Sequence, residues 1–471
     1  MYRRHFLAAA CAQAAPVRRR PNILYVFADQ LRAHSVGCYG NSEVKTPHLN
    51  RLASEGILFR NTFANTPVCC PARANMLTGK YAHRNGMIAN DLRLRESELT
   101  IAEILAQAGY RTGFLGKWHL DGGPRMPGFV PPGPRRQGFE FWAANECSHS
   151  HFNTQYFRDS PEPIPIKKFE AEAWTDVAID FLRQAKQDPR PFFLTVAMGP
   201  PHDPYGAPSE YMSQFEPARL TMRPNWKEGG ANVPGPKQIA AYYAATTAVD
   251  DQVGRMMKTL DELGLADDTI VLFSSDHGDM LGSHGLRLKR KPWEESIRIP
   301  GILRYPRGVK GGRSTDAMFT QVDFAPTLLG LCGLKPAAGM QGNDLSPVAT
   351  GKKSAVPDSA FFQIFGPYKG DGTEAAWRGV RTHRHMYARL RDKAWVLYDL
   401  REDPYQLKNL ADHPAAAAVQ ADMEKRLAQW MKRTGDSWDY NWSELVEDNG
   451  RLYRSQAFYT VEDFLKWERS R

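Results

Sequence analysis

The stretch Ile23-Leu24-Tyr25-Val26-Phe27-Ala28-Asp29-Gln30 decides the fold class of this 471-residue chain. Its six apolar residues in a row lack the alternation of a half-exposed strand, and such a run is typical of a strand covered on both faces. Three more apolar runs, at 113–116, 192–198 and 269–273, are likewise followed by a polar cluster. The four runs predict strands of a largely parallel sheet.

Helical patterns lie between these runs, for example at 99–108 and 240–263. Alternation of strands and helices predicts an α/β fold, with a large mixed, mostly parallel β-sheet sandwiched by helices. Ligands of such sheets gather at the carboxyl ends of the strands. We therefore expect the polar clusters that follow the four runs to meet at one edge: Asp29-Gln30, Lys117-Trp118-His119, Gly199-Pro200-Pro201-His202 and Asp276-His277.

The length of the chain exceeds what one ordinary core accommodates, which predicts a second unit. The composition changes near Gly351-Lys352-Lys353-Ser354. We therefore predict a catalytic domain at 21–352 and a smaller C-terminal subdomain at 353–471. Strand patterns at 376–390 and 394–400, with an amphipathic helix at 415–431, predict an antiparallel sheet and a helix in the subdomain.

Residues 1–20 have a basic start, a short apolar centre and small residues suited to cleavage, which together predict an export signal. The segment Arg3-Arg4-His5-Phe6-Leu7 resembles a twin-arginine signal. A periplasmic or secreted protein is expected, and a cytoplasmic protein with an unstructured basic N-terminus is the alternative. No apolar run approaches the roughly 20 residues that span a bilayer.

The composition excludes several classes of protein. The chain is 42% hydrophobic and 24% charged, as soluble globular proteins are. Its net charge of +9 suits a polyanionic partner, but no basic stripe or motif indicates nucleic acid. Six scattered cysteines define neither a disulfide framework nor a Cys-x-x-Cys metal site.

The run Cys69-Cys70-Pro71-Ala72-Arg73-Ala74-Asn75-Met76-Leu77-Thr78-Gly79 carries the strongest functional signal. An early proline and a terminal glycine predict a short helix with a thiol at its N-terminus. The helix dipole and a nearby arginine lower the pKa of such a thiol and make it reactive. These features by themselves name no reaction.

This run resembles the signature of the type I sulfatases, in the alkaline phosphatase-like superfamily. The signature is Cys-x-Pro-x-Arg followed by Leu-Thr-Gly, and it is matched by Cys69, Pro71, Arg73, Leu77, Thr78 and Gly79. The resemblance implies that a maturation enzyme oxidises Cys69 to formylglycine, whose hydrated aldehyde supplies the nucleophile. Arg73, four residues on, is expected to lie one helical turn away, within reach of a bond to the modified side chain.

The resemblance extends to a metal site. Asp29, Gln30, Asp276, His277 and the modified Cys69 take the places of its ligands, although the family commonly has a second Asp where this chain has Gln30. Oxygen ligands favour calcium, whereas a histidine nitrogen broadens the choice to manganese or zinc. Calcium is therefore expected, with the other two ions as alternatives.

Cleavage of a sulfate ester needs positive charge around the sulfate oxygens and a proton for the leaving alcohol. The family's Gly-Lys-Trp-His motif matches at Lys117 and His119, which by resemblance contact sulfate and hold the geminal diol. Pro201-His202-x-Pro204-Tyr205 matches a motif whose histidine lies by the leaving-group oxygen. Lys289 takes the place of the second sulfate-binding lysine.

Other histidines and one basic loop are candidate substrate contacts. His149 and His151 have the spacing of one face of a strand and no apparent carboxylate partner, which favours a substrate-contacting loop over a second metal site. His284 either touches the leaving group or stabilises its loop. The segment 122–138 predicts a long ordered loop, and its arginines between Arg125 and Arg136 suit an anionic glycan.

The sequence thus predicts hydrolysis of a sulfate monoester, on a sulfated carbohydrate. One alternative is a phosphonate monoester or phosphate diester hydrolase, since related enzymes use the same modified cysteine and the same Asp-Gln and Asp-His pairs. A second is a non-catalytic sulfoglycan-binding protein whose cysteine is never modified. The sugar, the sulfate position, endo or exo action and the oligomeric state stay open.

Overall fold

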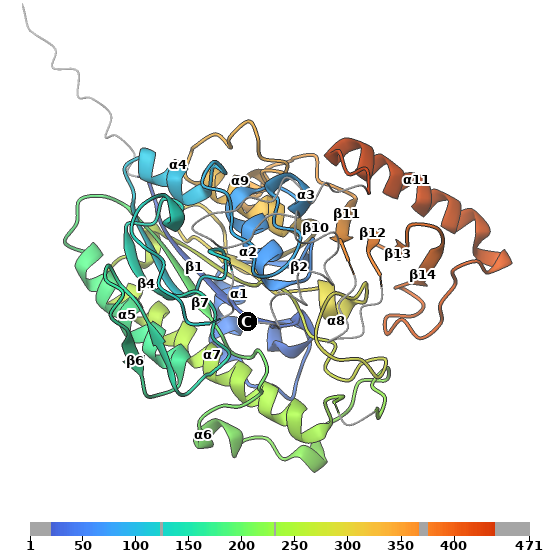
Figure 1. The fold of residues 1–471 in the computed structure, drawn as a ribbon, viewed down its shortest axis with the longest axis horizontal. Coiled ribbons are helices and arrows are strands. Elements are labelled where there is room, and N and C mark those ends of the chain that lie inside the picture. Colours follow the sequence, from blue (N-terminus) through green and yellow to red (C-terminus); the bar gives the residue numbers. More distant parts are fainter. Residues whose placement is uncertain (1–19, 123–125, 230–231, 367–374, 439–471) are drawn as a thin grey trace, which may run out of the picture.

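The four predicted strands lie next to one another in the middle of an eight-stranded sheet (Figure 1). The computed structural model describes residues 20–122, 126–229, 232–366 and 375–438. The predicted export signal lies outside these residues except for Arg20, and so does Arg125 of the basic loop. Helices cover both faces of the sheet, and a second, smaller sheet follows with a helix, which confirms the predicted fold class.

The large sheet has the strand order β10 (Arg313–Thr320), β2 (Ile57–Phe63), β9 (Gly301–Arg304), β8 (Thr269–Ser275), β1 (Asn22–Ala28), β7 (Phe192–Met198), β3 (Arg111–Lys117) and β4 (Phe141–Asn145). β9 runs antiparallel to β2 and β8, and all the other neighbours pair in parallel. The carboxyl ends of β1, β3, β7 and β8 therefore lie at one edge.

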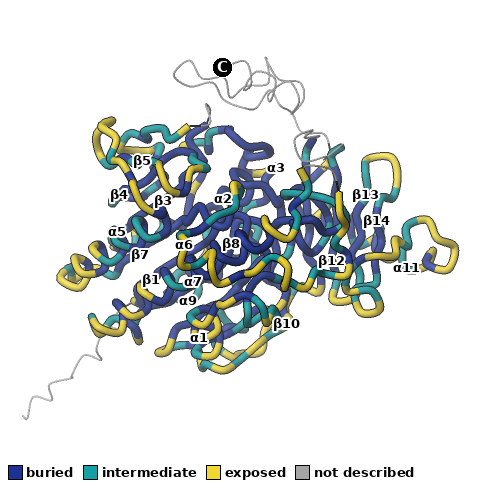
Figure 2. Tube along the Cα trace, turned by 90° about the horizontal axis from the view of Figure 1, so that it is seen from below, coloured by how far each residue is buried: buried dark blue, intermediate teal, exposed yellow. Residues whose placement is uncertain are grey.

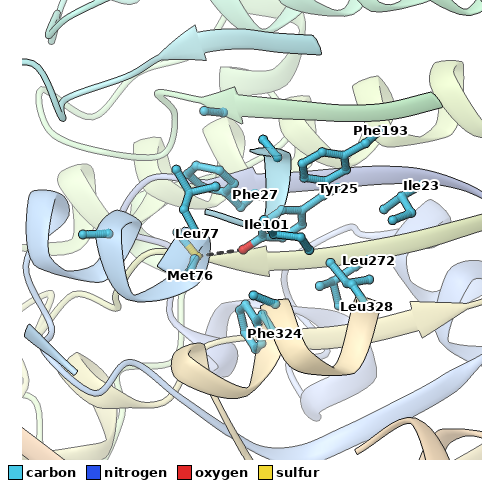
Figure 3. Close-up of a cluster of buried hydrophobic side chains, with 14 of the residues drawn as sticks. Ile23, Tyr25, Phe27, Met76, Leu77, Ile101, Phe193, Leu272, Phe324 and Leu328 are labelled. Atoms are coloured by element: carbon cyan, nitrogen blue, oxygen red, sulfur yellow. Dashed lines mark hydrogen bonds between the residues drawn. The ribbon is translucent and has the colours of Figure 1, made fainter. Parts of the chain in front are cut away.

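The helical layers follow from β1, whose side chains alternate between two cores. Ile23, Tyr25 and Phe27 share a core with α2 (Cys69–Thr78), α4 (Ile101–Gln107) and α9 (Gln321–Leu331), and Figure 3 shows part of it. Leu24, Val26 and Ala28 share the other with α1 (Pro47–Glu55), α5 (Glu170–Ala185) and α7 (Pro236–Glu262). Burial on both faces explains the unbroken apolar run. The strands are accordingly dark in Figure 2.

The small sheet consists of β11 (Ser359–Ile364), β12 (Trp377–Thr382), β13 (His385–Arg389) and β14 (Ala394–Asp399), all antiparallel. One face packs on α11 (Ala417–Thr434), and the other packs on residues of the large domain, including Val68 just before α2. The indole nitrogen of Trp377 donates to the carbonyl of Arg290 at 2.9 Å. The small sheet thus supports the segment that carries Lys289.

Short elements complete the described chain: α3 (Ala82–Asn85), α6 (Ser209–Met212), α8 (Glu294–Ile297), α10 (Ser346–Ala349), and a two-stranded ribbon of β5 (Thr154–Tyr156) and β6 (Ile164–Ile166). None of the described helices is long and apolar enough to cross a membrane.

Candidate active site

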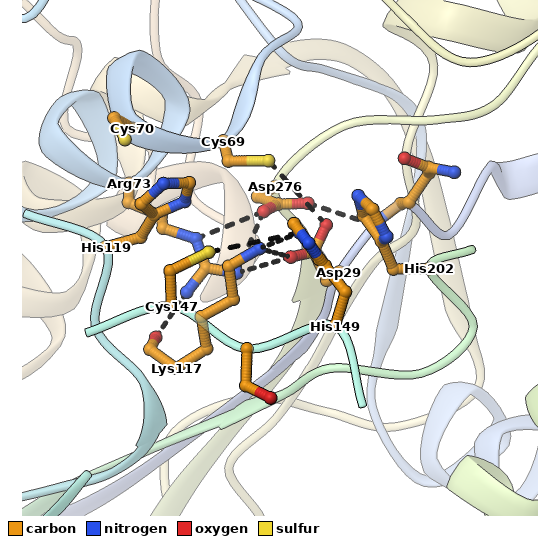
Figure 4. Close-up of polar contacts among 12 residues, drawn as sticks. Asp29, Cys69, Cys70, Arg73, Lys117, His119, Cys147, His149, His202 and Asp276 are labelled. Atoms are coloured by element: carbon orange, nitrogen blue, oxygen red, sulfur yellow. Dashed lines mark hydrogen bonds and ion pairs between the residues drawn. The ribbon is translucent and has the colours of Figure 1, made fainter. Parts of the chain in front are cut away.

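The polar clusters that follow the strands meet at one edge of the sheet, as predicted (Figure 4). Asp29 follows β1, Asp276 follows β8, Lys117 ends β3, and His202 lies four residues after β7. Because these neighbouring strands run in parallel, their carboxyl ends bring the side chains together. The N-terminus of α2 places Cys69 beside them.

Cys69 is the first residue of α2, and its side chain is buried. Its Sγ lies 3.3 Å from Nε2 of His277 and 4.0 Å from Oδ1 of Asp29. Burial raises the pKa of the thiol, but the ammonium groups of Lys289 and Lys117 outweigh it and hold that pKa well below its ordinary value. The surroundings therefore favour an anion at this position.

Four side chains form a cluster that can hold a cation. Asp29, Cys69, Asp276 and His277 each offer a ligand atom, and these atoms all lie within 4.8 Å of one another. His277 donates from Nδ1 to the carbonyl of Gly278 at 3.0 Å, which leaves Nε2 facing the cluster. Two fully buried carboxylates with a nitrogen and an oxidisable sulfur suit a divalent ion. The residues therefore fit the expected metal.

Gln30, the remaining predicted ligand, is held beside the cluster. Its amide nitrogen donates to Asp279 at 2.6 Å and to Asp203 at 3.2 Å, while its oxygen accepts from Lys289 at 2.5 Å. The backbone at Gln30 has φ of +68°, which turns the side chain out of the strand direction. The Gln30 oxygen is thus bonded to the ammonium of Lys289, and its role as a metal ligand stays a prediction.

Arg73 and Lys117 neutralise the two buried acids. The guanidinium of Arg73 lies 3.0 Å from Asp29 and from Asp276, and it also donates to the carbonyl of Lys117. The ammonium of Lys117 lies 2.7 Å from Asp29. Burial and the Cys69 thiol oppose ionisation of Asp29, yet Lys117 and Arg73 hold its pKa well below its usual range. Arg73 thus bonds the two acids, and its bond to a modified residue 69 stays a prediction.

His202 and Lys289 form the opposite side of the site. Both are buried, and Nζ of Lys289 lies 2.8 Å from Nε2 of His202. Since an ammonium only donates, this ring nitrogen accepts. Nδ1 of His202 then donates to the carbonyl of Asp203 at 2.5 Å. The structure therefore brings both predicted residues to the site, from segments 87 residues apart.

His119 is oriented by a carboxylate that the sequence did not reveal. Its Nε2 lies 2.7 Å from Oδ1 of Asp91, and its Nδ1 is buried without a hydrogen-bond partner among the described residues. Cys70 ties the Asp91 loop to α2, because its Sγ accepts from the backbone of Asp91 at 3.2 Å. Asn90 and Asp91 match no sequence motif. Only the contact with His119 in the folded protein therefore reveals the role of the Asp91 carboxylate.

His149 and His151 lie in a loop after β4, not on a strand. Nε2 of His149 lies 3.3 Å from Nζ of Lys117, and its ring stacks on His202 with centroids 4.3 Å apart. His151 instead points into the core, where its Nδ1 lies 2.5 Å from the carboxylate of Glu170. The prediction that the pair lacks a carboxylate partner is therefore wrong for His151.

The described arginines of the predicted basic loop form ion pairs and hydrogen bonds within the protein. Arg135 pairs with Asp121. Arg136 is buried and bonds the carbonyl of Val130 and the carboxylate of Asp159. Their charges are thus balanced within the protein, and the expectation that these two serve an anionic glycan is wrong.

His284 lies against the small sheet's side of the site. Its ring packs on Trp293, with centroids 5.1 Å apart, and one ring nitrogen lies 3.2 Å from the side chain of Asn225. These contacts favour the loop-stabilising role among the two that the sequence left open.

Acidic, basic and thiol groups thus gather at the carboxyl edge of an α/β sheet, an arrangement that fits the alkaline phosphatase-like superfamily. Residues 21–334 match the family model "Sulfatase", and residues 282–433 match "N-sulphoglucosamine sulphohydrolase, C-terminal". The chain belongs to the sulfatase family, whose members are sulfuric ester hydrolases.

Named relatives agree with this membership. The chain is 37% identical to the ulvan-active sulfatase of Formosa agariphila, over 89% of this chain and 82% of that protein. A solved structure from Bacteroides fragilis, described as "the putative sulfatase yidJ", superposes with a TM-score of 0.82 at 31% identity, covering 91% of this chain and 98% of the other. The structure of BT4656 with its substrate D-glucosamine-2-N,6-O-disulfate gives a TM-score of 0.80 at 25% identity, covering 89% and 99%.

Proposed function

We propose that this chain removes sulfate from a sulfated carbohydrate, with Cys69 converted to formylglycine and with calcium held by Asp29, Gln30, Asp276, His277 and residue 69. The convergence of Cys69 with this acidic cluster and two lysines carries the proposal. The relatives named for ulvan and for a disulfated glucosamine favour a glycan. Location outside the cytoplasm stays a prediction.

The chain's own residues perform binding and proton transfer. Formylglycine supplies the nucleophilic oxygen, and a bound cation lowers the charge of the acids around it. Lys117 and Lys289 both place positive charge near residue 69, where it can stabilise the sulfate oxygens. Nε2 of His202 accepts from the ammonium of Lys289 on the opposite side of the site, so a proton shared by this pair is available to the leaving alcohol.

Mass spectrometry of the purified protein tests the nucleophile. The tryptic peptide that begins at Asn61 contains Cys69. We expect it to carry an aldehyde in place of the thiol, and we expect Cys69→Ala to abolish turnover while the protein stays folded. An unmodified thiol in active protein contradicts the proposal and leaves the sulfoglycan-binding alternative.

Parallel kinetics decide between sulfur and phosphorus esters. The wild-type enzyme is assayed on an aryl sulfate, a phenyl phosphonate, a bis-aryl phosphate, and a panel of defined sulfated mono- and disaccharides. We expect the highest kcat/KM on a sulfated saccharide. Efficient turnover of the phosphorus esters alone contradicts the sulfated substrate and supports the phosphonate monoester or phosphate diester alternative.

A further inference from the structure

A groove of about 820 Å³ opens beside the proposed sulfate site. Its walls are the loop after β4, the open end of the β5–β6 ribbon, and Pro204 next to His202. Five neutral side chains that can form hydrogen bonds line it: Ser148, Ser150, Asn153, Thr154 and Gln155. Among its lining residues, Lys167 carries the sole ammonium and none carries a carboxylate. This chemistry suits a polar, anionic ligand.

His149 connects the groove to the sulfate site. It lines the groove, while its Nε2 lies 3.3 Å from the ammonium of Lys117. Because Lys117 only donates, Nε2 accepts and the ring proton lies on Nδ1. Burial and the charge of Lys117 lower the pKa of His149, so the ring is neutral. Nδ1 has no hydrogen-bond partner among the described residues, which leaves an N–H donor for a ligand in the groove.

The wall of the groove is fixed before any ligand binds. His151, two residues on, lies 2.5 Å from Glu170, and its Nε2 lies 2.7 Å from the carbonyl of His202. Trp174 donates to the same carboxylate at 3.1 Å. All of these side chains are buried except for a small part of His202. A rigid wall reduces the entropy lost on binding.

The β5–β6 ribbon places Lys167 at the edge of the groove. Thr154 pairs with Ile166 in antiparallel register. The next residues outward, Asn153 and Lys167, therefore lie together at the open end of the ribbon. Both are exposed. The next residue, Lys168, instead pairs with Asp176 on α5 and does not line the groove. One lysine of the two is therefore available to a ligand in the groove.

We propose that this groove is the subsite for the glycan that carries the sulfate, and that it selects an acidic glycan. His149 donates to an oxygen of the sulfated sugar, Asn153 bonds its hydroxyl groups, and Lys167 binds a second anionic group, either a carboxylate or another sulfate. The assignment rests on the proposed function, because the sulfate site next to the groove defines which end of the sugar enters.

Binding measurements test the groove separately from catalysis. The full chain with Cys69→Ala is titrated calorimetrically with three probes: 4-methylumbelliferyl sulfate, D-glucosamine-2-N,6-O-disulfate, and a disaccharide of a uronic acid and N-acetylgalactosamine 6-sulfate. The first has one anion, the second adds a sulfate, and the third adds a carboxylate. Each titration is repeated after Lys167→Ala, Asn153→Ala and the matched control Lys168→Ala.

We expect Lys167→Ala to weaken the affinity for at least one two-anion probe about fivefold more than that for the aryl sulfate, as loss of one exposed ion pair does. Asn153→Ala should weaken both saccharides, and Lys168→Ala should alter none. Loss for the disulfate alone assigns the second anion as sulfate, and loss for the uronate disaccharide alone assigns it as carboxylate.

Equal effects of Lys167→Ala and Lys168→Ala overturn the proposal, and so does absence of saccharide binding. Turnover by the wild-type enzyme separates this failure from failure of the proposed function. If the wild type hydrolyses a sulfate ester but the groove variants bind all probes alike, only the subsite is wrong.

Discussion

Single residues at this site depend on partners from distant segments. Asp29 is fully buried and is neutralised by Arg73 and Lys117, which come from α2 and β3. Removing either base takes away one of the two positive charges that compensate this buried carboxylate, which costs more than the loss of an exposed pair. The carboxylate of Asp29 therefore constrains which residues can occupy positions 73 and 117.

Asp91→Asn tests whether the carboxylate beside His119 positions that ring. The change keeps the size of the side chain but removes a charged hydrogen bond of 2.7 Å. We expect kcat to fall about 10- to 100-fold, as loss of a charged hydrogen bond implies, with little change in KM. Steady-state kinetics on an aryl sulfate measure both constants.

Two further variants separate positioning from folding. Asp91→Glu should recover part of the lost rate, and Asp91→Asn should add little to the defect of His119→Ala, because the two residues act as one unit. Additive effects in the double variant contradict a positioning role for Asp91.

At the scale of secondary-structure elements, helices and strands bring the site residues together. β3 does so by packing closely against β7. Gly116, just before Lys117, has φ of +97°, and a Cβ there would lie 1.9 Å from the carbonyl oxygen of Ala197. No other residue type fits between these two strands. The glycine thus permits the lysine to reach Asp29.

Gly116→Ala should destabilise the protein by about 3 kcal/mol or more, since the backbone of β7 must move. Gly109→Ala is the matched control, because Gly109 also has a positive φ, +87°, but nothing lies within 4 Å of the added Cβ. The control should cost only about 1–2 kcal/mol. Denaturant unfolding of the two variants measures the difference, and equal costs contradict the steric argument.

The first turn of α1 gives a pH-dependent prediction. Asp250 of α7 is buried and accepts from the backbone of His48 at 3.0 Å and of Leu49 at 2.7 Å. Burial raises the pKa of this carboxyl to about 7. The unfolded value is about 4. Protonation therefore favours the folded state, and this contribution is present below pH 4 and is lost as the pH rises to about 7.

Asp250→Asn removes that titration while keeping an acceptor for the helix. The Tm of the variant relative to the wild type should rise between pH 4 and pH 7 and stay level above pH 7. Thermal unfolding at several pH values measures it. A difference in Tm that is independent of pH contradicts the raised pKa.

At the scale of the whole molecule, the small sheet and the large domain share the active site. Trp377 of β12 is fully buried and bonds the carbonyl of Arg290, next to Lys289. Trp430 of α11 makes a comparable bond to Ser359 at 2.9 Å, on the other face of the small sheet. The two tryptophans thus differ mainly in distance from the site.

Trp377→Phe and Trp430→Phe form a matched pair. Each loses one indole hydrogen bond and should cost about 1 kcal/mol of stability. We expect Trp377→Phe alone to raise KM for a sulfate ester severalfold, because it loosens the segment that carries Lys289. Equal kinetics in both variants show that the small sheet does not position this lysine.

Metal binding should stabilise the entire fold, because its ligands come from β1, α2 and β8. An ion that binds only the native state at 100 times its Kd adds about 2.7 kcal/mol. Removal of calcium with a chelator should therefore lower both Tm and activity, and added calcium should restore them. Calorimetry with and without the chelator measures the shift, and restoration by manganese or zinc alone contradicts the choice of calcium.

The sequence predicted the sheet's central strands well because burial on both faces leaves an unmistakable apolar run, as in β1, β7 and β8. It did not predict β9 or β11. β9 has four residues, and its neighbours in space come from β2 and β8, far away in the chain. Local pattern carries no information on such pairing.

Sequence motifs also located Cys69, Lys117, His202 and Lys289 together, since each follows a recognisable strand or signature. They misplaced His151 and Arg136, because a charged side chain looks the same whether its partner is a ligand or a carboxylate such as Glu170 or Asp159. Partners distant in sequence decide between the two.

By itself, then, the sequence determined the α/β class, the family and the chemical types that gather at the strand ends, because apolar runs and contiguous motifs are local properties. Only the tertiary structure decided that Asp91 orients His119, that Arg73 bonds two acids, and that His149 lies between the candidate active site and a groove. These are contacts between segments far apart in the chain, and burial and charge pairing become definite only once the chain has folded.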